Sequence, residues 1–164
     1  MSKNRMAIIL LLGVMLAATI SAGLLRATAG SGTSSTLLGR GTFDAFHVNR
    51  EADALHVEVE AQTGLDIATQ MITFQPGGKS GWHSHPGPVF ITVMSGTMTF
   101  YDSGDPACSP VVRTAGQGFV DVGEHAHIAV NQSGAPAVNV VTYFAPVGAP
   151  LRINQDQPAN CPSF

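Results

Sequence analysis

The chain has 164 residues, of which 45% are hydrophobic and 12% are charged. This length and apolar content predict one domain with a continuous core, which can fold without the help of metal or disulfides. The formal net charge is -3, and the eight Lys and Arg residues form no run that could neutralise a track of phosphates. These numbers argue against nucleic acid as a partner.

The amino terminus, residues 1–29, has the features of an export signal or a membrane anchor. Lys3 and Arg5 precede an apolar run over residues 6–25, and basic flanks stay on the cytoplasmic side of a membrane. Small residues at 27–29 form the pattern that a signal peptidase cleaves, which favours a removed signal peptide. The alternative is an uncleaved anchor, because the apolar run is nearly long enough to cross a bilayer as a helix. Both interpretations place the remaining chain outside the cytoplasm, either secreted or tethered to the outer face of the cytoplasmic membrane.

Residues 30–40 are rich in Gly, Ser and Thr. They offer little apolar surface to bury, so we expect a flexible linker there. Residues 54–60 alternate between apolar and polar side chains, which predicts a half-buried strand. Further strands are expected at 66–74, 89–94, 97–101, 118–122, 127–130 and 137–145. Gly and Pro clusters separate nearly all of these runs, and short strands at this spacing predict an all-β sandwich or barrel over residues 41–150.

Cys108 and Cys161 lie in turn-like contexts and not in a metal-binding CxxC pattern. An even number of cysteines in an exported protein favours a disulfide. Such a bond would tie the carboxyl-terminal tail, residues 151–164, to a loop in the middle of the chain, and it typically stabilises a fold by roughly 2–4 kcal/mol. The alternative is two free thiols.

Four of the six histidines form two His-x-His pairs, His83 with His85 and His125 with His127. Residues two apart on a strand project from the same face, so each pair can converge on one point. If the two strands are neighbours in a barrel, both pairs can face one interior spot. Imidazoles are costly to bury without partners, whereas a divalent cation would give their nitrogens a common one. The pattern favours a metal site, and the alternative is a structural barrel whose histidines bind nothing.

The first histidine pair resembles the first motif of the cupin superfamily. That motif reads glycine, five residues, His-x-His, three or four residues, glutamate, six residues and glycine. Here Gly77, the pair of His83 and His85, and Gly96 keep every spacing, but Val89 stands where the glutamate is expected. Cupins commonly place both histidines and the glutamate on a metal. Position 89 shares strand parity with positions 83 and 85, so Val89 is expected to point inward as an apolar wall of the substrate pocket.

The second cupin motif supplies a third histidine and reads Pro-x-Gly, two residues, histidine, three residues and asparagine. Here residues 121–123 read Asp-Val-Gly, three residues intervene, and His127 and Asn131 follow. The spacing from histidine to asparagine selects His127 as the third ligand. His125 is left as a weak candidate for an acid or base at the rim, a fourth ligand or a surface residue. Glu124 is a distant candidate for the missing carboxylate.

The resemblance extends over roughly residues 64–146 and implies a single-domain double-stranded β-helix, the jelly-roll barrel of the cupins. It also implies a divalent transition metal held by His83, His85 and His127. Because the carboxylate is missing, such a site would keep open positions for water or an anionic ligand. Fe, Zn, Ni, Cu and Mn are all compatible with these expectations, and the sequence does not select among them.

Two functions fit these expectations. The first is an exported metalloenzyme, a dioxygenase or an isomerase, that acts on a small oxygenated molecule inside the barrel. The second is a non-catalytic module that binds a metal or small ligand outside the cytoplasm. Open coordination positions favour catalysis, whereas the scarcity of acid–base groups, with only His125, Tyr101 and Tyr143 available, argues against it. Cupins often dimerise, so a homodimer is also compatible with the resemblance.

Overall fold

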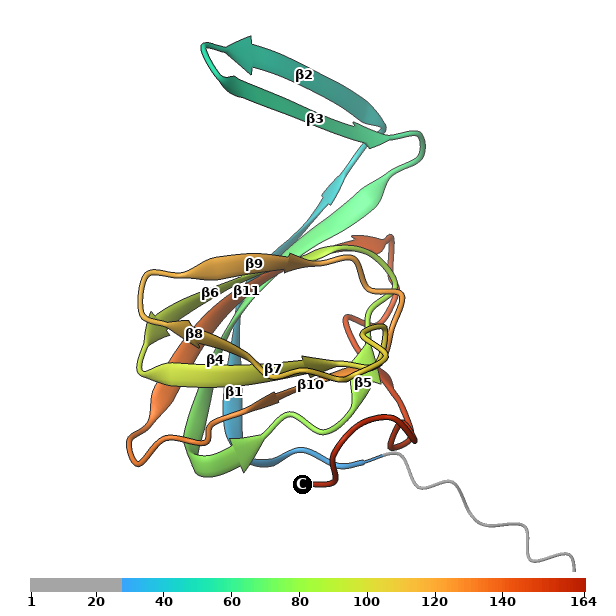
Figure 1. Ribbon diagram of the computed structural model, residues 1–164. Helices are drawn as coiled ribbons and strands as arrows, with labels where there is room; N and C mark the ends of the chain where they lie inside the picture. The colour runs from blue at the N-terminus through green and yellow to red at the C-terminus, as the bar shows by residue number, and fades with distance from the viewer. Residues whose placement is uncertain (1–27) are drawn as a thin grey trace, which may run out of the picture.

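The computed structural model describes residues 28–164, which form an all-β fold built around a nearly closed barrel (Figure 1). This confirms the predicted fold class. The predicted signal or anchor at residues 1–29 lies outside the described residues, except for its last two positions. Among the described residues, no helix has the length and apolar character needed to cross a membrane.

The described chain runs through strands only: β1 (Ser31–Phe43), β2 (Phe46–Ala52), β3 (Leu55–Ala61), β4 (Leu65–Lys79), β5 (His83–Ser84), β6 (Val89–Ser95), β7 (Thr97–Asp102), β8 (Val111–Thr114), β9 (Gly118–Asp121), β10 (His127–Val130), β11 (Ala137–Pro146) and β12 (Ile153–Asn154). Ten of them form one antiparallel sheet, and β2 and β3 pair only with each other. The main path of the large sheet is β12-β5-β10-β4-β11-β6-β9, with β1 beside β4 and with β7 between β10 and β8. This sheet curls into the barrel, so one of its faces encloses the core (Figure 1).

The barrel strands follow the two-residue period of their sequence. In β11 every second residue from Ala137 to Ala145 is buried. In β6 Val89, Ile91 and Val93 are buried, while the residues between them are exposed. β-Branched side chains suit such a pleated, half-buried surface. All six runs that the sequence predicts as strands after residue 65 are strands in the structure.

The prediction of a flexible linker at residues 30–40 is wrong for nearly all of that segment. Residues 31–40 belong to β1, which pairs along its length with β4, from Ser31 opposite Lys79 to Phe43 opposite Leu65. All thirteen residues of β1 are exposed. An edge strand needs backbone hydrogen bonds from its neighbour and little apolar burial, so its Gly- and Ser-rich composition does not prevent pairing.

The hairpin of β2 and β3 projects from the barrel as an arm, and β1 and β4 lead into it (Figure 1). The strand predicted at residues 54–60 is present as β3. Its apolar face is not half-buried, however, because Leu55 is 60% exposed and Val57 is 40% exposed. Among the described residues, no other strand pairs with the arm, and these two apolar side chains remain largely open to solvent.

Three clusters of buried side chains fill the barrel. The first contains Ala68, Val89, Ile91, Val141 and Tyr143, the second Phe74, Val93, Met98, Ala129 and Ala137, and the third Trp82, Tyr101, Cys108, Ile128 and Val130. Trp82 is 1% exposed, and its indole Nε1 donates a hydrogen bond of 2.7 Å to Gln157 in the carboxyl-terminal tail. Packing at the third cluster therefore anchors the residue that precedes the first histidine.

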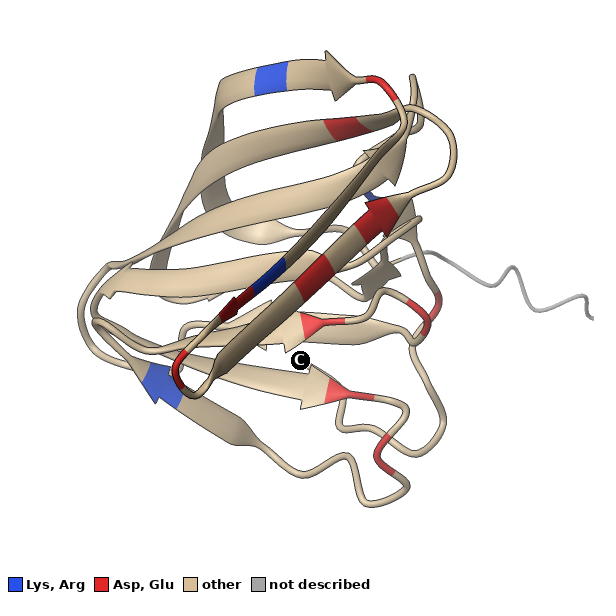
Figure 2. Cartoon of the chain, turned by 90° about the horizontal axis from the view of Figure 1, so that it is seen from above, with Lys and Arg blue, Asp and Glu red and all other residues tan. Residues whose placement is uncertain are grey.

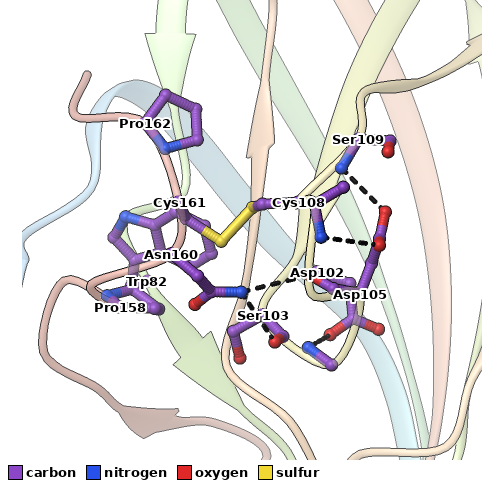
Figure 3. The surroundings of a disulfide bond; sticks show 12 residues. Trp82, Asp102, Ser103, Asp105, Cys108, Ser109, Pro158, Asn160, Cys161 and Pro162 are labelled. Atoms are coloured by element: carbon purple, nitrogen blue, oxygen red, sulfur yellow. Dashed lines mark hydrogen bonds between the residues drawn. A yellow bond between two sulfur atoms is a disulfide. The ribbon is translucent and has the colours of Figure 1, made fainter.

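A disulfide joins Cys108 to Cys161 (Figure 3), as the sequence analysis expects. Next to it, Asn160 donates two hydrogen bonds of 3.1 Å to backbone oxygens of the loop that carries Cys108. Upstream in the tail, β12 pairs with β5, so that Asn154 lies opposite His83. The tail is thus fixed at both ends and supports the strand that carries the first histidine.

Acidic side chains outnumber basic ones on the described chain. All eleven Asp and Glu residues of the sequence lie after residue 40, whereas only five of the eight Lys and Arg residues lie at or after that position. Figure 2 shows the basic positions spread over the barrel and the arm rather than gathered on one face. The described surface therefore carries no basic patch.

Candidate metal centre

Three histidines from separate positions in the chain come together inside the barrel. β5 and β10 are neighbours, and His83 lies opposite His127. The ring centroid of His83 is 4.9 Å from that of His85 and 4.3 Å from that of His127, and the last two rings are 4.9 Å apart. One nitrogen of each ring lies within 4.8 Å of the others. The structure brings together the residues that the resemblance implies as ligands.

Backbone carbonyls orient the three rings. His83 Nδ1 lies 2.8 Å from Gly81 O, and His85 Nδ1 lies 2.6 Å from Leu151 O. A carbonyl oxygen only accepts, so both rings carry their proton on Nδ1 and keep the lone pair of Nε2 for an ion. The ring of His127 has a longer contact of the same kind, 3.3 Å from Nδ1 to the backbone oxygen two residues earlier.

Burial keeps the first two rings neutral. It lowers the pKa of His83 well below 6.5, and the nearby His127 and Arg152 act in the same direction. Burial also lowers the pKa of His85 to about 4, although its hydrogen bond to a backbone oxygen opposes the shift. Neutral imidazole is the form that binds a metal. Two nitrogens at about 2.1 Å from one ion are at most about 4.2 Å apart, so small ring movements suffice, and the residues fit a divalent transition metal.

An open cavity of about 470 Å³ adjoins His83 and His85. Its polar lining includes Gln70, Tyr143 and Arg152. The hydroxyl of Tyr143 donates a hydrogen bond of 3.0 Å to Gln70, and the Tyr143 ring centroid lies 5.3 Å from that of His85. Burial raises the pKa of Tyr143 to about 12, so the hydroxyl keeps its proton at neutral pH. A hydroxyl donor and a guanidinium therefore lie beside the histidines.

Residues 70–143 match the family model of the cupin domain. Residues 70–143 therefore form a cupin domain. Among solved structures, the polyketide cyclase RemF from Streptomyces resistomycificus is 16% identical over 82% of this chain and 79% of that chain, with a TM-score of 0.52. A Klebsiella pneumoniae protein with a double-stranded β-helix domain is also 16% identical, over 70% of this chain and 86% of that chain, with a TM-score of 0.47. No curated protein sequence matches this chain, and the likeness to RemF concerns the fold alone.

Asp121 occupies the position of the proline in the second motif, and its place in the sequence alone predicted no role at the site. It ends β9, and its Oδ1 accepts a hydrogen bond of 2.7 Å from Gly123 N. Its Oδ2 lies 2.9 Å from His127 Nδ1 and 4.0 Å from His85 Nε2. Burial alone would raise the pKa of Asp121, but the contacts with His127 and Gly123 together lower it. Strand parity could have suggested this residue, but only the pairing of β9 with β6 shows which face is inside.

Val89 points inward and is fully buried, as the motif predicts, but it does not line the cavity beside the histidines. It packs in the first core cluster. Its register partner on β11, Tyr143, lines the cavity. The wall expected from Val89 is therefore provided by a longer side chain with a polar end.

The remaining acid–base candidates do not join the three histidines. His125 and Glu124 are exposed on the loop before β10, and the His125 ring packs against Gly104. Tyr101 belongs to the third core cluster, where its ring lies 4.8 Å from that of Phe164. Of the groups that the sequence offers for proton transfer, the structure places only Tyr143 beside the cluster.

Proposed function

We propose that this cupin binds a divalent transition metal through His83, His85 and His127. The observation that carries this proposal is the convergence of three imidazoles, each with Nδ1 beside a backbone oxygen. Outer partners of this kind hold metal-binding histidines in orientation. A divalent ion would give the inward nitrogens of the three rings a common partner.

We further propose that the adjoining cavity takes a small oxygenated molecule that carries a negative charge. Arg152 and Tyr143 support this, because both lie along the cavity beside the histidines. None of the described lining residues is acidic. Guanidinium stays charged at all ordinary pH values and matches the geometry of a carboxylate, and a buried hydroxyl can donate to a second oxygen. A small carboxylate is the chemistry that these groups recognise.

A site of this kind suits a metal-dependent dioxygenase or isomerase. A bound ion would supply a Lewis acid that polarises an oxygen of the substrate or, with a redox-active metal, a centre for oxygen chemistry. The chain itself would bind and orient the substrate. Arg152 would pair with its charge, and the Tyr143 hydroxyl would turn away from Gln70 to donate its one hydrogen bond to an oxygen of the substrate. Ile72 and Phe74 give the same cavity an apolar wall. The same contacts would serve a non-catalytic binding module. This is the second candidate because, apart from the proposed metal ligands, the described residues that line the cavity include no carboxylate or imidazole to act as a base.

We also propose that the cupin works outside the cytoplasm. The disulfide between Cys108 and Cys161 supports this location, because disulfides persist in oxidising compartments. The intact mass of the protein isolated from its native cells tests both the export and the fate of residues 1–29. A chain that begins near residue 30 indicates a cleaved signal, an intact chain in the membrane fraction indicates an anchor, and free thiols in an intact cytosolic chain would refute export.

Metal uptake tests the first proposal. Protein purified without added metal is incubated in turn with Fe, Zn, Ni, Cu and Mn, desalted and analysed for bound metal. The wild type and the control His56→Ala, which changes an exposed histidine of the arm, should retain one of these ions in stoichiometric amount. His83→Ala and His127→Ala should lose it. A folded wild type that retains none of the five metals would overturn the proposal.

Anion binding is tested on the cobalt-loaded protein with acetate, glycolate and oxalate as probes, followed by visible absorption. The wild type and Arg50→Gln, which removes an exposed charge from the arm, should respond alike. Arg152→Gln should weaken binding by roughly tenfold or more, because a charge-assisted hydrogen bond is lost. Equal affinity in all three proteins would contradict a role for Arg152.

Activity separates the enzyme from the binding module. Oxygen consumption by the iron-loaded protein is measured with diketones, thiols, phenolic compounds and keto acids, and isomerisation of the same compounds is followed by NMR. Turnover that disappears in His83→Ala would support the enzyme. Tight binding of a probe without turnover of any compound would support the binding module.

A further inference from the structure

We infer that Asp121 is the carboxylate of the metal centre, supplied by β9 in place of the glutamate that is absent at Val89. This inference rests on the proposed binding of a metal by the three histidines. Asp121 acts as a positioning residue: it holds His127 and places a negative charge beside the ion. The centre then has the charge of a cupin site with its glutamate, although the carboxylate comes from another strand.

The pairing of β6 with β9 puts the two positions side by side. Val89 lies directly opposite Asp121, and Ile91 lies opposite Phe119. Directly opposite residues of an antiparallel pair project from the same face, with Cβ atoms about 4.5–5.5 Å apart. Val89 is completely buried on the inner face, so Asp121 also projects inward. The carboxylate that β6 lacks at Val89 is therefore present on the neighbouring strand β9, at the directly opposite position.

A tight turn aims the carboxylate. Gly123 donates its N–H to Asp121 Oδ1, which leaves Oδ2 directed towards the histidines. Gly123 has a φ of 91°, and a Cβ there would lie 2.6 Å from Gly87 O and 2.9 Å from His85 O. Only glycine fits this close approach. The turn is thus fixed against the backbone that carries one of the histidines.

The free oxygen of Asp121 lacks a hydrogen bond among the described residues, although it is buried. Oδ2 lies 2.9 Å from His127 Nδ1, and the same ring nitrogen also lies 3.3 Å from His125 O. A buried carboxylate oxygen without a partner is costly. A cation held by His83, His85 and His127 would provide the missing interaction, and a small rotation of His127 would complete its hydrogen bond to Asp121.

The experiment compares Asp121→Asn with the wild type by competition for Zn²⁺ against a chromophoric chelator. Asparagine keeps the shape of the side chain and removes its charge. We expect the affinity for Zn²⁺ to fall about 10- to 100-fold, which is the usual effect of removing a carboxylate behind a metal-binding histidine. Asp121→Glu should stay much closer to the wild type. Glu124→Gln, which removes an exposed carboxylate nearby in the chain, is the matched control and should not change the affinity.

Transfer of the carboxylate provides the sharper test. In the double variant Val89→Glu with Asp121→Asn, the charge returns to the opposite strand, and the affinity for Zn²⁺ should recover most of the loss. The absorption of Co²⁺ bound to each variant reports the ligand environment independently of affinity. If the double variant does not fold, the affinities of Asp121→Asn and Asp121→Glu for Zn²⁺ still test whether the negative charge at position 121 matters.

The outcomes separate this inference from the proposed function. A wild type that binds no metal removes the proposed function and this inference with it. A wild type that binds Zn²⁺ only as tightly as Asp121→Asn, with the same Co²⁺ spectrum, leaves the three-histidine site intact and overturns the role of Asp121. A lower thermal midpoint of the metal-free Asp121→Asn protein with unchanged affinity would assign Asp121 to the turn alone and would also overturn it.

Discussion

Removal of the disulfide should cost much of the stability of this cupin. The bond between Cys108 and Cys161 closes a loop with a sequence separation of 53 residues. For a loop of this length, the entropy that the bond removes from the unfolded chain corresponds to about 4 kcal/mol at about 25 °C. Small domains are commonly stable by only about 5–15 kcal/mol. The double variant Cys108→Ser with Cys161→Ser should therefore unfold at markedly lower denaturant concentration.

The assay is equilibrium unfolding in urea, with a chelator present so that metal binding does not contribute. The free energy of unfolding of the double variant should fall by about 4 kcal/mol, and reduction of the wild type should have a similar effect. The tail also carries β12, which pairs with β5 at His83, so the reduced protein should bind Zn²⁺ more weakly. A loss of stability below about 1 kcal/mol would show that the chain-entropy reasoning does not hold for this loop.

Three further predictions concern pH and packing. The metal-free protein should lose stability as the pH falls from 6.5 towards 4, because the pKa of His85 is about 4 in the folded protein and 6.5, its ordinary value, in the unfolded chain. At about pH 5 this loss is about 2 kcal/mol from His85 alone, and a flat urea midpoint over that range would contradict it. The pKa of Asp66 is lowered from 3.8 to about 2 by hydrogen bonds from Thr42 and Gly148 and by Arg40, so NMR should find Asp66 ionised at about pH 3, and the stability it adds should disappear as the pH falls from 3.8 through about 2. Trp82→Ala should lower the free energy of unfolding by about 3–5 kcal/mol, because it empties a core position, and unchanged urea unfolding would refute that.

Much of the barrel was predictable because strands can be recognised from local sequence. The alternation in residues 137–145 and the turn residues between the runs depend only on neighbours in the chain, and the corresponding strand β11 is present. The three histidines were predictable for a related reason. Their spacing matches motifs that place them on adjoining strands, and the structure puts His83 opposite His127.

The same local reasoning failed where a partner strand decides the outcome. Residues 31–40 have the composition of a linker, yet they pair with β4, which supplies the backbone hydrogen bonds that composition does not reveal. Arg152 follows a turn and carries no motif, so nothing in its neighbourhood places it in a cavity beside His85. The face formed by Leu55 and Val57 was expected to be half-buried, and within this chain it is exposed.

The sequence by itself determined an all-β domain, its principal strands and a set of histidines able to meet, because side-chain alternation and motif spacing are properties of one strand at a time. Only the tertiary structure decided which strands are neighbours and which of their faces is inside. That pairing set Asp121 across from Val89 and brought its carboxylate to His127. Alternation along one strand shows which residues share a face of the sheet, but it does not show which residue of another strand lies opposite. In this site the pairing between strands brings the carboxylate to the histidines.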